Sequence, residues 1–232
     1  MAGAGWRDFV AGEVLTAANV QDYLQDQAVM TFASSAARGS AIASPTEGMV
    51  SYLKDTDRLE VYTTAWTSYT AGLIPITTVS FTSAATVNFN SVFSSKYDNY
   101  RIVFNAIGST TLSVFFRLRS GTTDNTAAEW DTQELTINGA SATPVRVSGL
   151  TNALINVAYT DGTSSINDVF SPYLAAYTRV INTMLDSSSA TAPIARLYNS
   201  QNGLNTSFDG FTLYTSTGTM TGTATVYGYA KV

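Results

Sequence analysis

The chain has 232 residues, of which 45% are hydrophobic and only 12% are charged, and it contains neither histidine nor cysteine. A chain of this length and hydrophobicity can bury a full core, which excludes disorder as its overall state. The missing residue types exclude Ser-His-Asp and Cys-His catalysis, disulfide bonds, and metal sites built on histidine or cysteine. Most enzyme classes are therefore excluded, and we expect no cofactor and no metal ion.

The charged residues are few and scattered. The formal net charge is −5, with four basic and eight acidic residues before residue 70 and eight basic and nine acidic residues after it. A nucleic-acid surface needs clustered Lys and Arg, so no nucleic-acid partner is expected. Arg117 and Arg119 share one strand face, which we expect to be solvated or salt-bridged. A surface of Ser, Thr, Asn, Gly and Tyr suits packing between identical chains or hydrogen bonding to neutral ligands such as sugars.

Targeting and membrane signals are absent from the sequence. No apolar run approaches the roughly 18 residues of a membrane helix, and the N-terminus lacks the basic start and apolar core of a signal peptide. We therefore expect a protein that is made in a cytoplasm and does not insert into a membrane.

One amphipathic helix is predicted near the N-terminus, over about residues 17–31. Thr16 is a good N-cap, and apolar residues recur at helical spacing after it. So short a helix is marginal in water, and no second helical pattern follows nearby to cover its apolar stripe. A partner chain is the simplest cover. The residues that we assign to oligomerisation and attachment are Trp6, Phe9, Val20, Tyr23 and Leu24.

A β-hairpin is predicted over about residues 49–66, after a stretch of small residues at 32–48. The alternating runs Met49–Leu53 and Leu59–Tyr62 are joined by a polar turn, and the second run ends at Trp66. The two carboxylates of the turn, Asp55 and Asp57, lack the further ligand spacing of a calcium site.

Several blocks in this region carry a family resemblance. They are Gly12–Leu24, then Phe32–Arg38, then Glu47–Asp57, followed by Val61-Tyr62 and Trp66. In this order they resemble the N-terminal region of small tail-fibre or minor structural proteins of tailed bacteriophages, over roughly the first third of the chain. The resemblance implies that residues 1–72 are a virion-attachment and oligomerisation module, that the protein is a homotrimer, and that it belongs to the virion.

An all-β domain is predicted over residues 73–232. Leu73–Ile76 is expected to be a linker because of Pro75, and the clearest strands are Tyr97–Ile107 and Leu112–Arg119 with a hairpin turn at Gly108–Thr111. The other predicted strands are Glu134–Ile137, Pro144–Val147, Leu154–Tyr159, Ser165–Phe170, Arg179–Leu185, Ile194–Tyr198, Phe211–Tyr214 and Gly222–Val232. Short strands with Gly, Asn, Asp and Ser between them are typical of an antiparallel β-sandwich or jelly roll. The last strand is expected to be central.

A ligand site is predicted where an acidic cluster, 124–134, surrounds a tryptophan expected to be exposed. The cluster has three interpretations: carboxylates that hold a sugar stacked on the Trp, an acid and a nucleophile for glycoside hydrolysis, or a polar loop whose Trp packs against the sandwich. The loops 186–192 and 198–205 could join it at one end of the sandwich. The candidate ligand-binding residues are Glu129, Trp130, Asp131, Tyr198, Asn199 and Asn202.

These observations predict a bacteriophage virion structural protein, a short tail fibre that binds a host surface glycan or protein through its C-terminal β-sandwich and another virion protein through its N-terminal segment. It is not expected to be an enzyme, and the chain has no repeated rungs like those of β-helical phage depolymerases. The alternatives are a head fibre or capsid decoration protein and, thirdly, a carbohydrate-cleaving tail enzyme acting through Glu129 and Asp131.

Overall fold

A computed structural model describes residues 9–25, 28–68, 72–186 and 194–231. The chain divides into two compact units, one up to Gly72 and one from Leu73 to Lys231. It is mainly β, with 57% of its residues in strands and 7% in helices. No helix among the described residues is long and apolar enough to cross a membrane.

The N-terminal helix is shorter than predicted. Helix α1 (Ala17–Val20) begins after Thr16, whose side chain accepts a hydrogen bond from the Asn19 backbone N–H at 3.1 Å. It continues as a π-helical segment, η1 (Gln21–Gln25). The prediction of one helix to residue 31 is wrong, because strand β1 (Val29–Phe32) lies there and pairs in parallel with β2 (Val50–Leu53). The hydrogen bonds to a neighbouring strand outweigh local helical spacing in this segment.

A second short helix, α2 (Ser35–Ala41), follows β1 in the stretch of small residues where no helix was predicted. The Ser34 side chain caps it by accepting a hydrogen bond from the Ala37 N–H at 3.2 Å. Small residues with one good cap are enough for this single helix of under two turns, because Arg38 anchors it to the neighbouring sheet.

The sheet of the first unit has the order β1-β2-β3-β4. The predicted hairpin is formed by β2 (Val50–Leu53) and β3 (Arg58–Tyr62), but Trp66 belongs to a third antiparallel strand, β4 (Trp66–Ser68). Arg38 is buried against this sheet, where it pairs with Glu60, donates to Ser51 Oγ at 3.0 Å and lies 4.0 Å from the centre of the Trp66 ring. One buried arginine therefore joins α2 to three strands.

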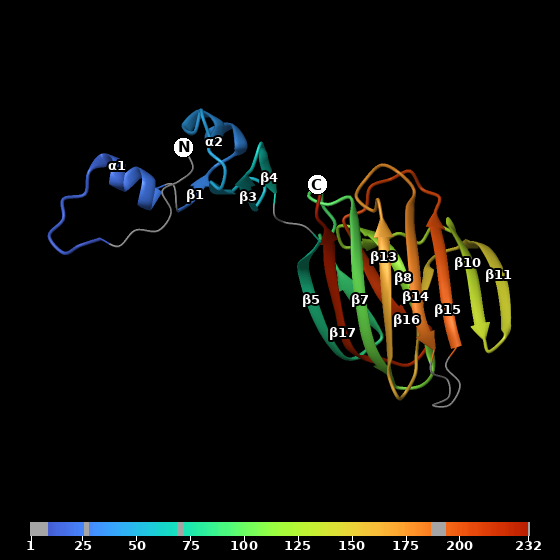
Figure 1. The fold of residues 1–232 in the computed structure, drawn as a ribbon. Helices are drawn as coiled ribbons and strands as arrows, with labels where there is room; N and C mark the ends of the chain where they lie inside the picture. The colour runs from blue at the N-terminus through green and yellow to red at the C-terminus, as the bar shows by residue number, and fades with distance from the viewer. Residues whose placement is uncertain (1–8, 26–27, 69–71, 187–193, 232) are drawn as a thin grey trace. The chain divides into compact units, whose positions relative to one another are not determined.

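The second unit is a sandwich of two antiparallel sheets (Figure 1). The large sheet has the order β11-β10-β15-β14-β13-β7-β17-β5, and the small sheet has the order β12-β8-β16-β6, with β9 also paired to β8. In the large sheet the strands are β5 (Leu73–Ala84), β7 (Asn99–Gly108), β10 (Trp130–Asn138), β11 (Ser141–Leu150), β13 (Thr163–Phe170), β14 (Thr178–Asp186), β15 (Ile194–Asn202) and β17 (Met220–Tyr229). The small sheet contains β6 (Thr86–Phe89), β8 (Leu112–Ser120), β9 (Thr123–Asp124), β12 (Ala153–Ala158) and β16 (Gly210–Thr215).

The core lies between the two sheets. The predicted inward face of β8 is confirmed: the four residues of that face, Leu112, Val114, Phe116 and Leu118, are at most 2% exposed. They pack in one cluster with residues of β7 from the large sheet. Phe116 also stacks on Phe211 at 5.1 Å between ring centres. The period of two in β8 therefore assigns its faces correctly.

Two predicted connections are wrong. Leu73–Ile76 is the start of β5 and not a linker; Pro75 is tolerated there because β5 is an edge strand of the large sheet, beside a register shift in β17. Gly108–Thr111 is not a hairpin turn, because β7 and β8 belong to different sheets. Both strands direct alternate apolar residues into one core, so their patterns alone do not distinguish pairing from crossing.

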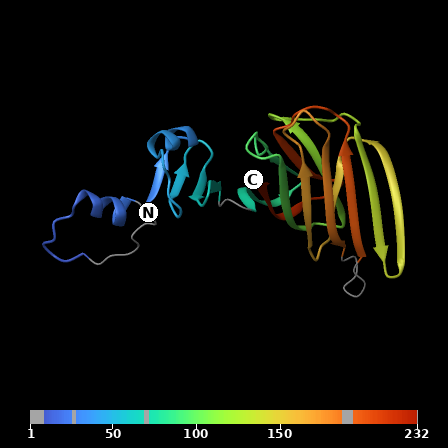
Figure 2. The same ribbon diagram turned by 45° about the horizontal axis from the view of Figure 1, so that its top comes forward.

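The last strand, β17, is hydrogen-bonded on both sides, to β7 and to β5, although it ends at Tyr229. The opposite edge of the large sheet is β11, which pairs only with β10 in the sheet (Figure 2). Almost every residue of β11 is exposed. Pro144 lies in the middle of β11, where a missing N–H weakens pairing with another chain.

A polar cluster connects β7, β13 and β17. Arg101 Nε and Nη2 donate to the two carboxylate oxygens of Asp168, each at 2.7 Å, and the Tyr229 hydroxyl donates to Asp168 Oδ1 at 2.7 Å. Burial would raise the pKa of Asp168, but the hydrogen bonds from Arg101 and Tyr229 outweigh it and lower that pKa. Burial and the bond to Asp168 raise the pKa of Tyr229 to about 12.

This cluster predicts a loss of stability in alkaline solution. Between the ordinary tyrosine pKa of 10.0 and about 12, the folded chain keeps the Tyr229 proton while the unfolded chain releases it, so the free energy of unfolding falls as pH rises. Urea unfolding at pH 9 and pH 11 measures this fall. Tyr229→Phe is expected to show a smaller fall than the unmodified chain. An equal fall in both proteins would contradict the assignment.

Candidate functional site

The tryptophan of the predicted ligand site is not on the surface. Trp130 is 1% exposed and packs edge-on against Phe116, with 6.0 Å between ring centres. It cannot stack a sugar ring in this position. Of the three interpretations of the acidic cluster, the one in which the Trp packs against the sandwich agrees with this position, and the one in which a sugar stacks on the Trp does not. The first residue of β10 is inward because the alternation of that strand places it there.

The other predicted ligand residues lie on two neighbouring strands, β10 and β15, except Glu129, which directly precedes β10. Trp130 is opposite Asn202, and Glu134 is opposite Tyr198. Tyr198 and Asn202 are buried at 1% exposure, and Asn202 Oδ1 accepts the Leu204 N–H at 3.1 Å. Burial raises the pKa of Tyr198. The structure thus brings the two segments together, but as paired strands whose central side chains are already in the core.

Three of the predicted residues remain accessible: Glu129, Asp131 and Asn199. Asp131 accepts the Gly149 N–H at 3.3 Å and lies 4.0 Å from Arg146. The Glu129 carbonyl accepts the Gly203 N–H at 2.8 Å. These contacts hold the start of β10 against neighbouring segments of the chain. None of them involves an aromatic side chain.

The predicted attachment residues of the first unit are partly placed. Phe9, Val20 and Leu24 are exposed, at 37%, 41% and 47%, and Tyr23 packs edge-on against Phe9. Trp6 lies outside the described residues. Four other large apolar residues of this segment, Val10, Val14, Leu15 and Val29, are also exposed. Exposed apolar residues therefore occur both before and after α1 along the chain, which the spacing of the helix alone did not indicate.

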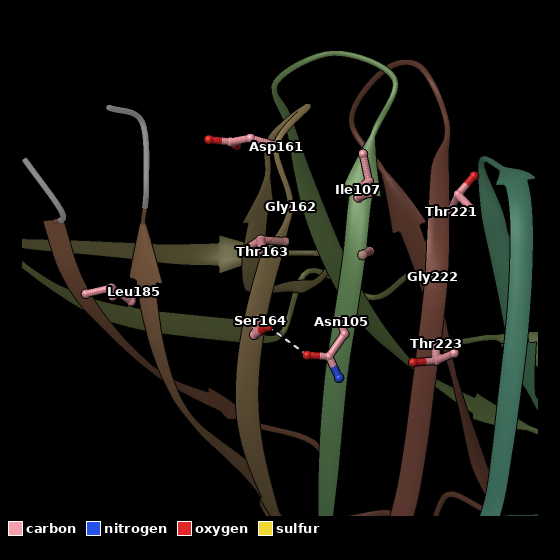
Figure 3. A pocket seen from close by; sticks show the side chains of 11 residues that line it. Asn105, Ile107, Asp161, Gly162, Thr163, Ser164, Leu185, Thr221, Gly222 and Thr223 are labelled. Atoms are coloured by element: carbon pink, nitrogen blue, oxygen red, sulfur yellow. Dashed lines mark hydrogen bonds between the residues drawn. The ribbon is translucent and has the colours of Figure 1, made fainter. Parts of the chain in front are cut away.

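A shallow depression of about 700 Å³ lies at one end of the large sheet (Figure 3). Hydroxyl and amide groups line it together with aliphatic side chains, and Ser164 donates to Asn105 Oδ1 at 2.6 Å. The rim includes the exposed side chains of Ile107 and Leu185. No aromatic or basic side chain is among its lining residues. It offers hydrogen bonds without a stacking surface, so it is a weak candidate for a sugar site.

The second surface is on the outer face of the small sheet, and we call it the aromatic–arginine face. It consists of Phe115, Arg117, Arg119, Asp124, Thr151, Asn152 and Tyr214. Since Leu112, Val114, Phe116 and Leu118 of β8 point into the core, the alternate residues Phe115, Arg117 and Arg119 share the opposite face. Phe115 is directly opposite Tyr214 on β16, with 5.3 Å between ring centres and 40° between ring planes.

Arg117 lies beside this aromatic pair. Its Nη2 donates to the Tyr214 hydroxyl at 2.8 Å, and its Nε donates to the Thr151 carbonyl at 3.2 Å. Its guanidinium is 4.5 Å from the centre of the Tyr214 ring. Burial raises the pKa of Tyr214 above the ordinary value of 10.0, at which the hydroxyl is already protonated at neutral pH and can donate a hydrogen bond. The aromatic rings of Phe115 and Tyr214 therefore lie beside the hydrogen-bonding groups of Arg117 and Thr151.

Arg119 is the buried member of the face. Its Nη1 donates to Asp124 Oδ1 at 2.6 Å, to Asn88 Oδ1 at 2.8 Å and to Thr212 Oγ1 at 2.6 Å, and its Nη2 donates to the Thr122 carbonyl. The expectation of a solvated or salt-bridged face for the two arginines is thus confirmed in its salt-bridged form. Arg119 holds Asp124 in place, and Arg117 is the accessible cation.

The alternation of β8 already placed Phe115 and the two arginines together. What the sequence did not indicate is that Tyr214, almost a hundred residues later, lies beside them. That proximity depends on β16 pairing with β8. Among the described residues, no group of three or more acidic side chains is placed to hold a metal ion.

No family model matches the chain. The comparisons with curated proteins and with solved structures also find no similar protein.

Proposed function

We propose that this chain is a structural protein of a bacteriophage virion, a short tail fibre that binds the host surface through its β-sandwich without catalysis. Its first unit would dock to another virion protein, and three copies would assemble into one fibre. We also propose that the strands of the sandwich are connected in a jelly-roll-like order. Three weak sites on one fibre would gain avidity by engaging the host together.

The single observation that carries the binding role is the aromatic–arginine face. Aromatic rings beside hydrogen-bonding groups suit the two sides of a sugar ring, which is apolar on its C–H face and polar at its hydroxyls. Phe115 and Tyr214 are only half-buried, so part of each ring is open to solvent. The exposed apolar residues between Phe9 and Val29 support the docking role of the first unit in the same way.

The proposal predicts selective staining of host cells. The labelled full chain is expected to stain susceptible cells and not resistant ones, and Arg117→Gln should lower the apparent affinity about tenfold, the effect of losing about 1.4 kcal/mol in a charged hydrogen bond. Flow cytometry over a protein titration measures both. Arg179→Gln is the matched control, because Arg179 is exposed on the large sheet and donates to Gln201 at 3.1 Å.

The alternative is a head fibre or capsid decoration protein, and the same two-unit layout supports it. If the full chain stains neither cell type, the tail-fibre proposal fails. Copy number per particle then tests the alternative, since decoration proteins follow the symmetry of the capsid. A carbohydrate-cleaving role has less support, because Trp130 between Glu129 and Asp131 is in the core.

A further inference from the structure

We propose that the aromatic–arginine face binds an acidic saccharide, with a sugar carboxylate on Arg117 and a sugar ring against Phe115 and Tyr214. The inference deepens the proposed receptor-binding function and rests on it. It concerns the chemical class of the ligand, which was predicted from the sequence only as a host surface glycan or protein.

The aromatic–arginine face has more positive than negative side chains. Two guanidinium groups, Arg117 and Arg119, share one carboxylate, Asp124. Asp124 Oδ1 is already shared between Arg119 Nη1 and the Thr212 hydroxyl, each at 2.6 Å. Asp124 Oδ2 is 3.9 Å from Arg117 Nη1, which is too long for a hydrogen bond. Arg117 therefore keeps N–H groups and positive charge available for a second carboxylate.

The second argument is that Arg117 is held in a fixed position. Its Nε and Nη2 are engaged by the Thr151 carbonyl and the Tyr214 hydroxyl, which leaves Nη1 as the donor with no hydrogen bond among the described contacts. A guanidinium held in this way loses little further freedom when a carboxylate binds. The Tyr214 hydroxyl, which accepts from Arg117, can donate its own hydrogen to the same ligand.

The third argument is the apolar row beside the cation. The rings of Phe115 and Tyr214 are inclined by 40°, and Leu154 of β12 is directly opposite Phe115 on its other side. Three half-buried apolar side chains in one row across β12, β8 and β16 would cover one face of a sugar ring. A simple inorganic anion would make no use of this row.

A carboxylate is favoured over a phosphate by Asp124. A ligand on Arg117 Nη1 lies near Asp124 Oδ2, and a doubly charged phosphate is repelled more strongly than a singly charged carboxylate. Nucleic acid is disfavoured for the same reason, together with the lack of clustered basic residues.

The test uses the full chain and three pairs of probes. Oligosaccharides of galacturonate, of glucuronate and of N-acetylneuraminate are each compared with their methyl esters by isothermal titration calorimetry. The esters keep the ring and its hydroxyls but remove the negative charge. We expect at least one acid to bind about tenfold more tightly than its ester, with an affinity that falls as salt is added.

Variants show whether the charge effect belongs to this face. Arg117→Gln should abolish the difference between acid and ester, Tyr214→Phe should weaken both several-fold while keeping the difference, and Arg179→Gln should change neither. Circular dichroism and thermal unfolding check that each variant is folded. Equal binding of every acid and its ester, binding of none of them, or a difference that survives Arg117→Gln would overturn the inference. If staining of host cells depends on Arg117 in any of these cases, the ligand class is wrong but the receptor-binding function stands.

Discussion

Trp130→Ala is expected to lower the free energy of unfolding of the β-sandwich by about 3–5 kcal/mol, the usual cost of removing a large buried aromatic side chain. Trp130 is 1% exposed and contacts the Phe116 ring edge-on, so the truncation leaves a cavity in the core. Equilibrium unfolding in urea, followed by circular dichroism, measures the loss. Trp130→Phe should cost less, because it fills part of the cavity.

Val147→Ala is a suitable control for this prediction, since Val147 is 44% exposed on the edge strand β11 and should cost little. A Trp130→Ala protein that kept its stability but lost ligand binding would contradict the buried position. It would instead favour the ligand role that the sequence suggested.

Asp124→Ala is expected to cost about 3 kcal/mol, because it leaves the guanidinium of Arg119 buried without its carboxylate. The Arg119 side chain is 6% exposed, and its 2.6 Å contact with Asp124 is much shorter than the 3.9 Å contact between Asp124 and Arg117. Unfolding in urea again measures the change. The double variant Arg119→Met with Asp124→Ala should recover much of the loss, since it removes both charges.

The matched control for Asp124→Ala is Asp131→Ala. Asp131 also pairs with an arginine, Arg146, but at 4.0 Å and with both side chains well exposed, so its removal should change stability little. Equal losses in the two variants would show that burial of Arg119 does not set the energy of the pair.

Only part of the candidate site could be predicted from the sequence. The period of two in β8 correctly placed Phe115, Arg117 and Arg119 on one face, because side-chain alternation is a local property of an extended backbone. Trp130 was predicted to be exposed and to stack a sugar because acidic residues surround it in the sequence. Its burial depends on β10 lying in the large sheet across the core from Phe116, which is a tertiary fact.

The connections between strands were also predicted only in part. Met49–Leu53 and Leu59–Tyr62 were predicted to pair because their turn is short and polar, and they do. The segment 108–111 also looked like a short polar turn, yet it crosses between sheets. The predicted helix to residue 31 failed because pairing of Val29–Phe32 with β2 outweighs helical spacing.

The mainly β class, the inward faces of the clearest strands and the lack of histidine and cysteine side chains could all be read from residue types and local periodicity. Which strands are neighbours is a property of the tertiary structure. That choice buries Trp130, Tyr198 and Asn202, and it brings Tyr214 beside Arg117 across a strand pair. Strand pairing is a long-range contact whose energy comes from the whole core, so no local pattern in the sequence records it.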